Sequence, residues 1–324
     1  MRGFAASDAV RESMTMKSFL TWLAMAMLGC SSVCLAAPLA SERVTIESLD
    51  TDPVTGKPVL VDALLFKPPA SAVKAGERRP TVIALHGCGG MYSALAARRD
   101  QLSIRHQTMA ELLVAEGYVV LFPDSFRSRG TEEICTVENR RRTIVQRHRR
   151  QDAQGALRWL QSRPEVRADR VAVLGWSHGG SAVLATMNAK QHEVAGWPRQ
   201  TPPTPYFRAA VAFYPGCVES LRAPEGYALA APLTLFVAGS DDWTAPKPCV
   251  DLAARLVAAG EPATITVYPD AYHGFDGPSS QPRLRLDVPN GVHPGQGVTV
   301  ATDPKARDDA YAKLKVFLRE RLAP

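Results

Sequence analysis

The sequence predicts an α/β fold in which a mostly parallel, twisted sheet is covered by helices on both faces. Two fully apolar runs, Thr81–Leu85 and Tyr118–Phe122, have the composition of strands that are buried on both faces. Segments with helical spacing of apolar residues separate such runs, and this alternation is typical of parallel sheets. Of the 324 residues, 46% are hydrophobic and 22% are charged, which indicates a globular rather than a disordered chain.

The expected elements follow in order along the chain. Arg43–Leu49 and Val59–Phe66 have no helix between them, so we expect an antiparallel edge there. Later strands are expected at Thr81–Leu85, Tyr118–Phe122, Val171–Leu174, Ala209–Tyr214, Leu233–Val237 and Ala263–Tyr268. Helices are expected at Thr108–Glu116, Val137–Gln161, Ser181–Lys190, Val250–Ala259 and Tyr311–Leu322. Residues 276–304 are rich in Pro and Gly and lack periodicity, which indicates a functional loop or a small excursion.

The first residues have the order of a secretory signal peptide. Lys17 precedes the short apolar run Phe19–Leu28, and small residues follow that run. We expect cleavage after Ala36, which removes residues 1–36, with residues 1–15 as an upstream extension. A single domain over residues 37–324 would then be periplasmic or secreted, with no membrane span. A lipoprotein signal ending at Cys30 is the alternative.

The charge pattern gives little sign of a nucleic-acid partner. The net charge of +6 is mild, and the densest basic run is Arg140–Arg142 with Arg147–Arg150. Aromatic residues do not interleave with this run, so a solvated helix face is the expected structure. No Cys or His spacing is typical of a zinc site, and we expect neither a metal nor a cofactor. Nothing in the sequence indicates the oligomeric state.

A candidate nucleophile lies in the segment Gly175-Trp176-Ser177-His178-Gly179. This G-x-S-x-G pattern follows a predicted strand and precedes a predicted helix. The serine must project from a sharp, strained turn, so its neighbours at −2 and +2 need to be glycine. The sequence therefore indicates Ser177 as a nucleophile.

A serine hydroxyl needs a base, and His273 is the candidate. It follows the last core strand, from where it can fold back over the carboxyl edge of the sheet. An acid that orients the imidazole is expected after Leu233–Val237, where Asp241 and Asp242 are adjacent. The residues alone favour Asp241 and leave Asp242 as the alternative.

Stabilisation of an oxyanion needs backbone N–H groups aimed at the developing charge. We expect one from His178, directly after the nucleophile, and one from Cys88 in the glycine-rich loop that follows Thr81–Leu85. The aromatic residues Phe126, Trp176 and Trp243 are candidate walls of the substrate pocket.

Together these segments resemble the dienelactone hydrolase family. The matching segments occur in the family's order over about residues 80–320: His86-Gly87-Cys88-Gly89-Gly90, Pro123-Asp124-Ser125-Phe126 with Arg129-Gly130, the Ser177 segment through Gly180, Phe213-Tyr214-Pro215-Gly216-Cys217, Asp241-Asp242-Trp243-Thr244 and Tyr272-His273-Gly274-Phe275-Asp276. The resemblance implies the α/β-hydrolase fold and Asp241 as the acid. It also implies that carboxylic ester or lactone bonds of small molecules are cleaved through an acyl-enzyme.

One position departs from the enzyme that names the family, which carries cysteine where Ser177 stands. The resemblance therefore supports ester-type hydrolysis more strongly than action on dienelactone itself. Two other functions stay open: a peptidase or amidase that uses the same triad, and a non-catalytic envelope binding protein that keeps the fold.

Four cysteines lie beyond the expected cleavage site. Cys88, Cys135, Cys217 and Cys249 each follow a predicted strand at the carboxyl end of the sheet. An even number in an oxidising compartment is typical of disulfides. We expect Cys88–Cys135 and Cys217–Cys249 bridges, with four reduced and partly buried cysteines as the alternative.

Overall fold

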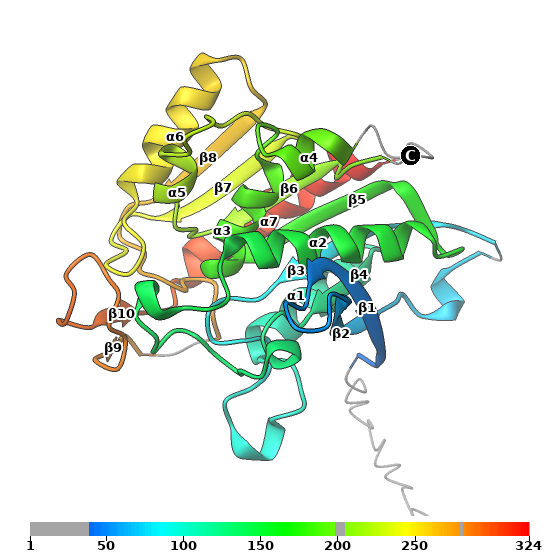
Figure 1. Cartoon of the computed structure of the whole chain (residues 1–324), viewed down its shortest axis with the longest axis horizontal. Coiled ribbons are helices and arrows are strands. Elements are labelled where there is room, and N and C mark those ends of the chain that lie inside the picture. Colours follow the sequence, from blue (N-terminus) through cyan, green and yellow to red (C-terminus); the bar gives the residue numbers. More distant parts are fainter. Residues whose placement is uncertain (1–38, 75, 198–204, 279–280, 324) are drawn as a thin grey trace, which may run out of the picture. The chain divides into compact units, whose positions relative to one another are not determined.

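A mixed sheet forms the centre of the computed structural model, which describes residues 39–74, 76–197, 205–278 and 281–323 (Figure 1). Within these residues the sheet has eight strands in the order β1-β2-β4-β3-β5-β6-β7-β8. Their bounds are β1 Ser41–Thr51, β2 Pro58–Phe66, β3 Arg79–Leu85, β4 Val119–Pro123, β5 Val166–Trp176, β6 Ala209–Phe213, β7 Leu233–Ala238 and β8 Ala263–Tyr268. β1 and β2 pair antiparallel, as does β2 with β4, and the other pairs are parallel. The predicted antiparallel edge is confirmed.

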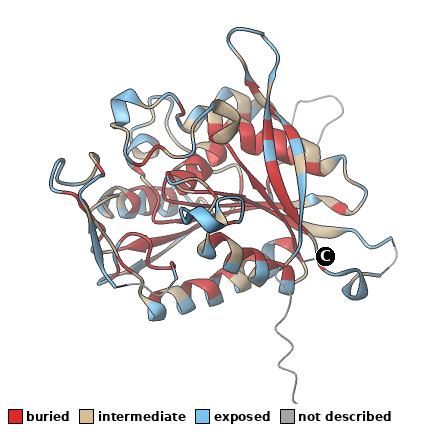
Figure 2. Cartoon of the chain, turned by 90° about the horizontal axis from the view of Figure 1, so that it is seen from below, coloured by how far each residue is buried: buried red, intermediate tan, exposed pale blue. Residues whose placement is uncertain are grey.

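Helices cover both faces of the sheet. Their bounds are α1 Ile104–Ala115, α2 Gln146–Gln161, α3 His178–Met187, α4 His192–Gly196, α5 Val218–Leu221, α6 Lys247–Ala258 and α7 Pro304–Leu322. One core cluster contains residues of α2, α3 and α6, and a second contains residues of α1 and α7. Figure 2 shows the buried residues concentrated in the sheet and on the helix faces turned toward it.

The apolar runs of the central strands follow from this arrangement. In β3, Ile83 and Leu85 belong to one core cluster while Val82 and Ala84 belong to the other. Successive side chains of a strand point to opposite faces, so a strand covered on both faces must be apolar at every position. The mostly parallel sheet with helices on both faces is therefore confirmed.

The long helix predicted over Val137–Gln161 is wrong in its first part. The structure has a short 3-10 turn at Asn139–Arg141, and α2 begins only at Gln146. The backbone of this segment bonds elsewhere, because Val137 O accepts from the Asn290 side-chain amide at 2.8 Å and Asn139 N donates to Asn290 Oδ1 at 2.8 Å. A contact distant in sequence thus overrides the local helical pattern.

The irregular segment after His273 is a small excursion. It contains the antiparallel pair β9 Arg283–Arg285 and β10 Val298–Val300. The last helix begins at Pro304 rather than at the expected Tyr311, because the Asp303 side chain accepts hydrogen bonds from Lys305 N and Ala306 N. The predicted signal peptide lies outside the described residues. In the described part of the chain, no helix is both long and apolar enough to cross a membrane.

Candidate active site

Ser177 occupies a strained turn between β5 and α3. Its φ of 51° lies in the left-handed region, which non-glycine residues rarely adopt. Ser177 N donates to Phe213 O of β6 at 2.9 Å, which holds the turn against the sheet. A β-carbon at Gly175 would overlap the Gly179 carbonyl, and one at Gly179 would overlap Leu85 O. The glycines at −2 and +2 are therefore required by space.

A hydrogen-bond chain joins three of the predicted site residues. Ser177 Oγ lies 2.9 Å from His273 Nε2, and His273 Nδ1 lies 2.8 Å from Asp241 Oδ2. All three side chains are buried. A carboxylate accepts at Nδ1–H, so Nε2 is left as the acceptor for the serine hydroxyl. In this geometry the serine proton has an acceptor and the imidazole has a fixed orientation.

The two adjacent carboxylates have different partners. Asp241 Oδ1 accepts from Trp243 N at 2.9 Å and Thr244 N at 2.8 Å, and the Thr244 hydroxyl donates to Asp241 Oδ2 at 2.8 Å. Asp242 accepts from Thr299 N and from Thr299 Oγ1, both at 2.7 Å. Asp241 therefore reaches His273, whereas Asp242 holds strand β10.

The segment that carries His273 is fixed from several sides. His273 forms a parallel bridge with Val300 of β10. The rings of Tyr214 and Trp243 each lie with their centroids 4.7 Å from that of the imidazole. Gly274 follows with a φ of 77°, a conformation that lets the chain turn directly after the histidine. The imidazole is thus held by aromatic packing as well as by Asp241.

Asp276, three residues further on, is a buried carboxylate that ties this segment to the core. Asp276 accepts from Trp176 Nε1 and from the Tyr214 hydroxyl, both at 2.7 Å, and Arg105 Nε lies 3.0 Å from Asp276 Oδ1. The expectation that Trp176 lines the pocket is therefore wrong, because its ring packs in the core and its N–H is bound to Asp276. The expectation is also wrong for Phe126, whose side chain is wholly buried in a small cluster around a disulfide.

The loop that follows β3 lies beside the serine turn. A β-carbon added at Gly87 would sit 3.7 Å from Ser177 Cβ. Cys88 of this loop and His178 line the same cavity as Ser177. The two backbone positions expected to stabilise an oxyanion therefore border the space around the serine hydroxyl.

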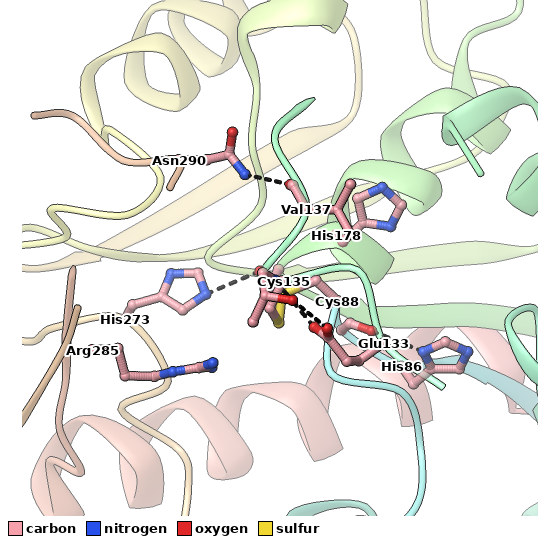
Figure 3. The surroundings of a disulfide bond; sticks show 12 residues. His86, Cys88, Glu133, Cys135, Val137, His178, His273, Arg285 and Asn290 are labelled. Carbon is pink, nitrogen blue, oxygen red and sulfur yellow. Dashed lines mark hydrogen bonds between the residues drawn. A yellow bond between two sulfur atoms is a disulfide. The ribbon is translucent and has the colours of Figure 1, made fainter. Parts of the chain in front are cut away.

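Two disulfides fix loops around this cavity. Cys88 is bonded to Cys135, and Cys217 to Cys249, which are the pairings expected from the sequence. Figure 3 shows the first bridge with His178, His273 and Asn290 around it. Disulfides form and persist in oxidising compartments. The two bridges therefore suggest an oxidising, extracytoplasmic environment.

The cavity at Ser177 has a volume of about 350 Å³. Trp243 lines it, as expected. Its other walls include Arg142, Ile144, Cys217, Asn290 and Val292. The Asn290 side chain closes one side through its bonds to residues 137 and 139, and the bond to Val137 is visible in Figure 3. Sequence reasoning missed Arg142 and Asn290 as cavity residues, since neither belongs to a catalytic motif. Asn290 was signalled only by the unusual composition of residues 276–304, and Arg142 only by the basic run that was expected to be a solvated helix face.

The basic run is not a solvated helix face throughout, and that expectation is wrong for two arginines. Arg149 and Arg150 of α2 are 0% and 5% exposed. Arg150 Nη2 pairs with Glu193 Oε1 at 2.9 Å, and Arg149 Nη1 lies 3.0 Å from His178 Nδ1. Burial, together with the positive charges of Arg149 and Arg142, holds the pKa of His178 well below its usual range. The His178 imidazole is therefore neutral.

Comparison of the sequence with models of known protein families identifies a family for this chain. The model described as the dienelactone hydrolase family matches residues 61–322. A curated relative, 5-methylorsellinic acid synthase of Aspergillus terreus, is 30% identical over 182 residues, which are 52% of this chain and 6% of that protein. The chain thus spans only about 6% of the length of that relative.

Two solved structures are similar in fold. The apo form of Thermogutta terrifontis esterase 2 is 18% identical, with a TM-score of 0.56 over 89% of this chain and 98% of that chain. The dienelactone hydrolase-like promiscuous phosphotriesterase P91, from metagenomic libraries, is 16% identical, with a TM-score of 0.58 over 88% of this chain and 100% of that chain. At these identities the similarity establishes the fold, and the predicted α/β-hydrolase architecture is confirmed.

Proposed function

The chain belongs to the dienelactone hydrolase family, and we propose that it is a serine hydrolase that cleaves carboxylic ester or lactone bonds of small molecules. The observation that carries this proposal is the continuous hydrogen-bond chain from Asp241 through His273 to Ser177 at the edge of a cavity. The esterase and phosphotriesterase names of the structural neighbours support an ester as the bond that is cleaved.

The acylation step follows from the order of these groups. Ser177 Oγ attacks the carbonyl carbon while His273 Nε2 accepts the serine proton. Asp241 holds the imidazole and stabilises the imidazolium that forms. The negative charge on the carbonyl oxygen faces the backbone N–H groups of His178 and Cys88. When the tetrahedral intermediate collapses, His273 returns the proton to the leaving alcohol.

Deacylation uses the same groups with water in place of the serine. His273 removes a proton from the water, whose oxygen attacks the ester carbon of the acyl-enzyme. The bond from that carbon to Ser177 Oγ then breaks, His273 returns the proton to Ser177 Oγ, and the acid is released. With a lactone, the alcohol formed in the first step stays attached to the acyl group, so the product is a hydroxy acid. The cavity of about 350 Å³ suits a small substrate.

We also infer that the protein is exported, with residues 1–36 removed and residues 37–324 as the mature domain. The two disulfides support this, because such bridges persist in the periplasm and outside the cell. N-terminal sequencing of protein recovered from the cell envelope or medium tests it. A mature chain that starts at Ala37 is expected; a lipid-modified Cys30 would replace this inference with the lipoprotein alternative.

Labelling with a fluorophosphonate tests the proposed nucleophile directly. We expect the wild-type protein to be labelled and Ser177→Ala to be unlabelled, with kcat lowered by about 10⁶. Ser162→Ala is a matched control, since Ser162 lies at the end of α2 and should leave labelling intact. Labelled Ser177→Ala protein would refute the assignment of the nucleophile.

A substrate panel separates ester hydrolysis from the two other functions. It contains p-nitrophenyl esters of increasing acyl length, several lactones and a peptide anilide. We expect esters or lactones to give the highest kcat/KM. Faster cleavage of the anilide would favour the peptidase or amidase alternative. Absence of both turnover and labelling in the wild-type protein would favour a binding protein.

A further inference from the structure

Arg149 is a buried cation without a direct ion pair among the described residues. Its side chain is 0% exposed, and its Nε and Nη2 atoms have no hydrogen-bond partner in that part of the chain. Burial lowers the pKa of its guanidinium to about 9. An unpaired charge in a protein interior is costly, and the Phe126 ring, whose centroid lies 5.2 Å from the guanidinium carbon, offsets only part of that cost.

The two neighbouring acids, Asp152 and Asp124, form no direct ion pair with Arg149. Asp152 receives both Nη atoms of Arg129 at 2.8 and 2.9 Å and the hydroxyl of Ser48. Asp124 Oδ1 accepts from Phe126 N and Arg127 N, each at 3.1 Å. These carboxylates act on Arg149 only at longer range, so its positive charge is not cancelled by a direct contact.

The hydrogen bond that Arg149 does form leads to the serine turn. Its Nη1 lies 3.0 Å from Nδ1 of His178, the residue directly after Ser177 and the first of α3. A guanidinium can only donate, so His178 Nδ1 must be the acceptor and the ring proton lies on Nε2. Arg149 therefore fixes the tautomer and the orientation of the His178 ring.

We propose that Arg149 is a positioning residue for the oxyanion hole, a role that rests on the proposed function. Arg149 holds the imidazole ring of His178 in place through a hydrogen bond. The backbone N–H of that same residue faces the developing oxyanion, so fixing the ring also helps to fix the N–H. The charge of Arg149 also lies next to the side chain of the first residue of α3, where the helix dipole already favours a negative charge. In a buried site such a charge acts through a low dielectric and is in place before the reaction begins.

Two substitutions of Arg149 test this role with a p-nitrophenyl ester. Arg149→Met removes the charge and keeps an unbranched apolar chain. Because the charge has no direct ion pair, its removal leaves no buried counter-charge unpaired, and we expect the melting temperature to be kept. We expect kcat to fall by about tenfold to a hundredfold, less than the loss of an oxyanion donor itself. KM should stay within about threefold, because the effect is confined to the transition state. Arg149→Lys keeps the charge and should restore part of kcat.

Arg129→Met is the matched control. Arg129 is a mostly buried arginine that pairs with Asp50 and Asp152 and does not contact His178. Its loss should lower the melting temperature while the folded protein keeps its kcat. A merely structural Arg149 would behave in the same way, whereas the proposed role lowers kcat without lowering the melting temperature.

A double-mutant cycle with His178→Phe tests the route through the ring. Phenylalanine keeps the backbone N–H and removes Nδ1, so the double variant should lose about as much kcat as Arg149→Met alone. Independent, multiplying losses would overturn the route through His178. Wild-type kcat in Arg149→Met would overturn the whole inference. If that variant is unstable, wild-type kcat in both Arg149→Lys and His178→Phe would overturn it.

The failure of this inference differs from failure of the proposed function. A wild-type protein that neither reacts with fluorophosphonate nor turns over any ester removes the proposed function, and this role with it. An active wild-type protein whose Arg149→Met variant is equally active removes only the role of Arg149.

Discussion

Removal of the Cys88–Cys135 bridge should weaken both the fold and the reaction. Cys88 lies in the loop beside Ser177, and Cys135 lies in the loop after β4. Replacement of both by serine removes the bridge and leaves no unpaired thiol. The bond from Ile134 N to Cys88 O, 2.8 Å long, would then be a remaining direct link between the two loops.

The size of the loss in stability follows from the loop that the bridge closes. The two cysteines are 47 residues apart, and closure of such a loop is worth about 4 kcal/mol in the chain-entropy model. The cluster of Phe126, Ile134 and Ile144 packs around this bridge, so its loss also loosens a small core. We expect kcat to fall about tenfold, because the Cys88 N–H is no longer held at the position of the oxyanion.

Equilibrium urea unfolding and turnover of a p-nitrophenyl ester measure the two effects. The matched control is the double serine variant of Cys217 and Cys249, whose separation of 32 residues gives a similar loss of about 4 kcal/mol. That control should keep kcat within about threefold, since its bridge does not hold the oxyanion loop; because Cys217 lines the cavity, its replacement is expected to affect KM instead. An unchanged kcat without the Cys88–Cys135 bridge would refute the tethering argument. A loss below about 1 kcal/mol would refute the loop-closure argument.

Three further predictions concern titratable residues. Asp241→Asn should lower kcat by about 10⁴ and Asp242→Asn by much less, so the reverse ranking in steady-state kinetics would make Asp242 the acid. Burial of His106, on the inner face of α1, lowers its pKa to about 4, so the folded state excludes a proton that the unfolded chain binds near pH 6.5. The stability that His106 confers is therefore complete above pH 6.5 and is lost as the pH falls toward 4, by about 2 kcal/mol between pH 7 and pH 5. Urea unfolding at both pH values should show a smaller loss in His106→Gln, and an equal loss would contradict the assignment. Asp276→Asn leaves the partly buried Arg105 without its counter-charge and should cost about 2 kcal/mol in urea unfolding; wild-type stability would show that the pair contributes nothing.

The parts of the fold that could be predicted are those with a local signature. Residues Val82–Leu85 of β3 and the whole of β4 are apolar because both of their faces are covered, and that pattern is visible in the sequence. The Ser177 turn carries its own steric requirement in Gly175 and Gly179. His273 lies 96 residues from Ser177, yet the carboxyl ends of parallel strands meet at one edge, so the order of elements was enough to bring them together.

The errors concern features that depend on distant contacts. The segment before α2 has helical spacing, but its backbone bonds to Asn290, about 150 residues away. Charge patterning treats every arginine as solvated, so it could not reveal that Arg149 is buried and contacts the His178 ring. The choice of Asp241 was not an error, but the residues alone left Asp242 open, because the contact that turns Asp242 toward Thr299 is not encoded in any local pattern.

The backbone β-bridge between His273 and Val300 has a consequence for the exchange of segments among related enzymes. The segment that joins β9 to β10 contributes Asn290 and Val292 to the wall of the cavity. Val300 of β10 also pairs with His273, so the same hairpin supports the proposed base. A graft of residues 283–300 from a homologue, intended to alter which substrates fit, would therefore also displace the imidazole. Such chimeras should recover turnover only when the Asp242–Thr299 contact is transplanted with the graft.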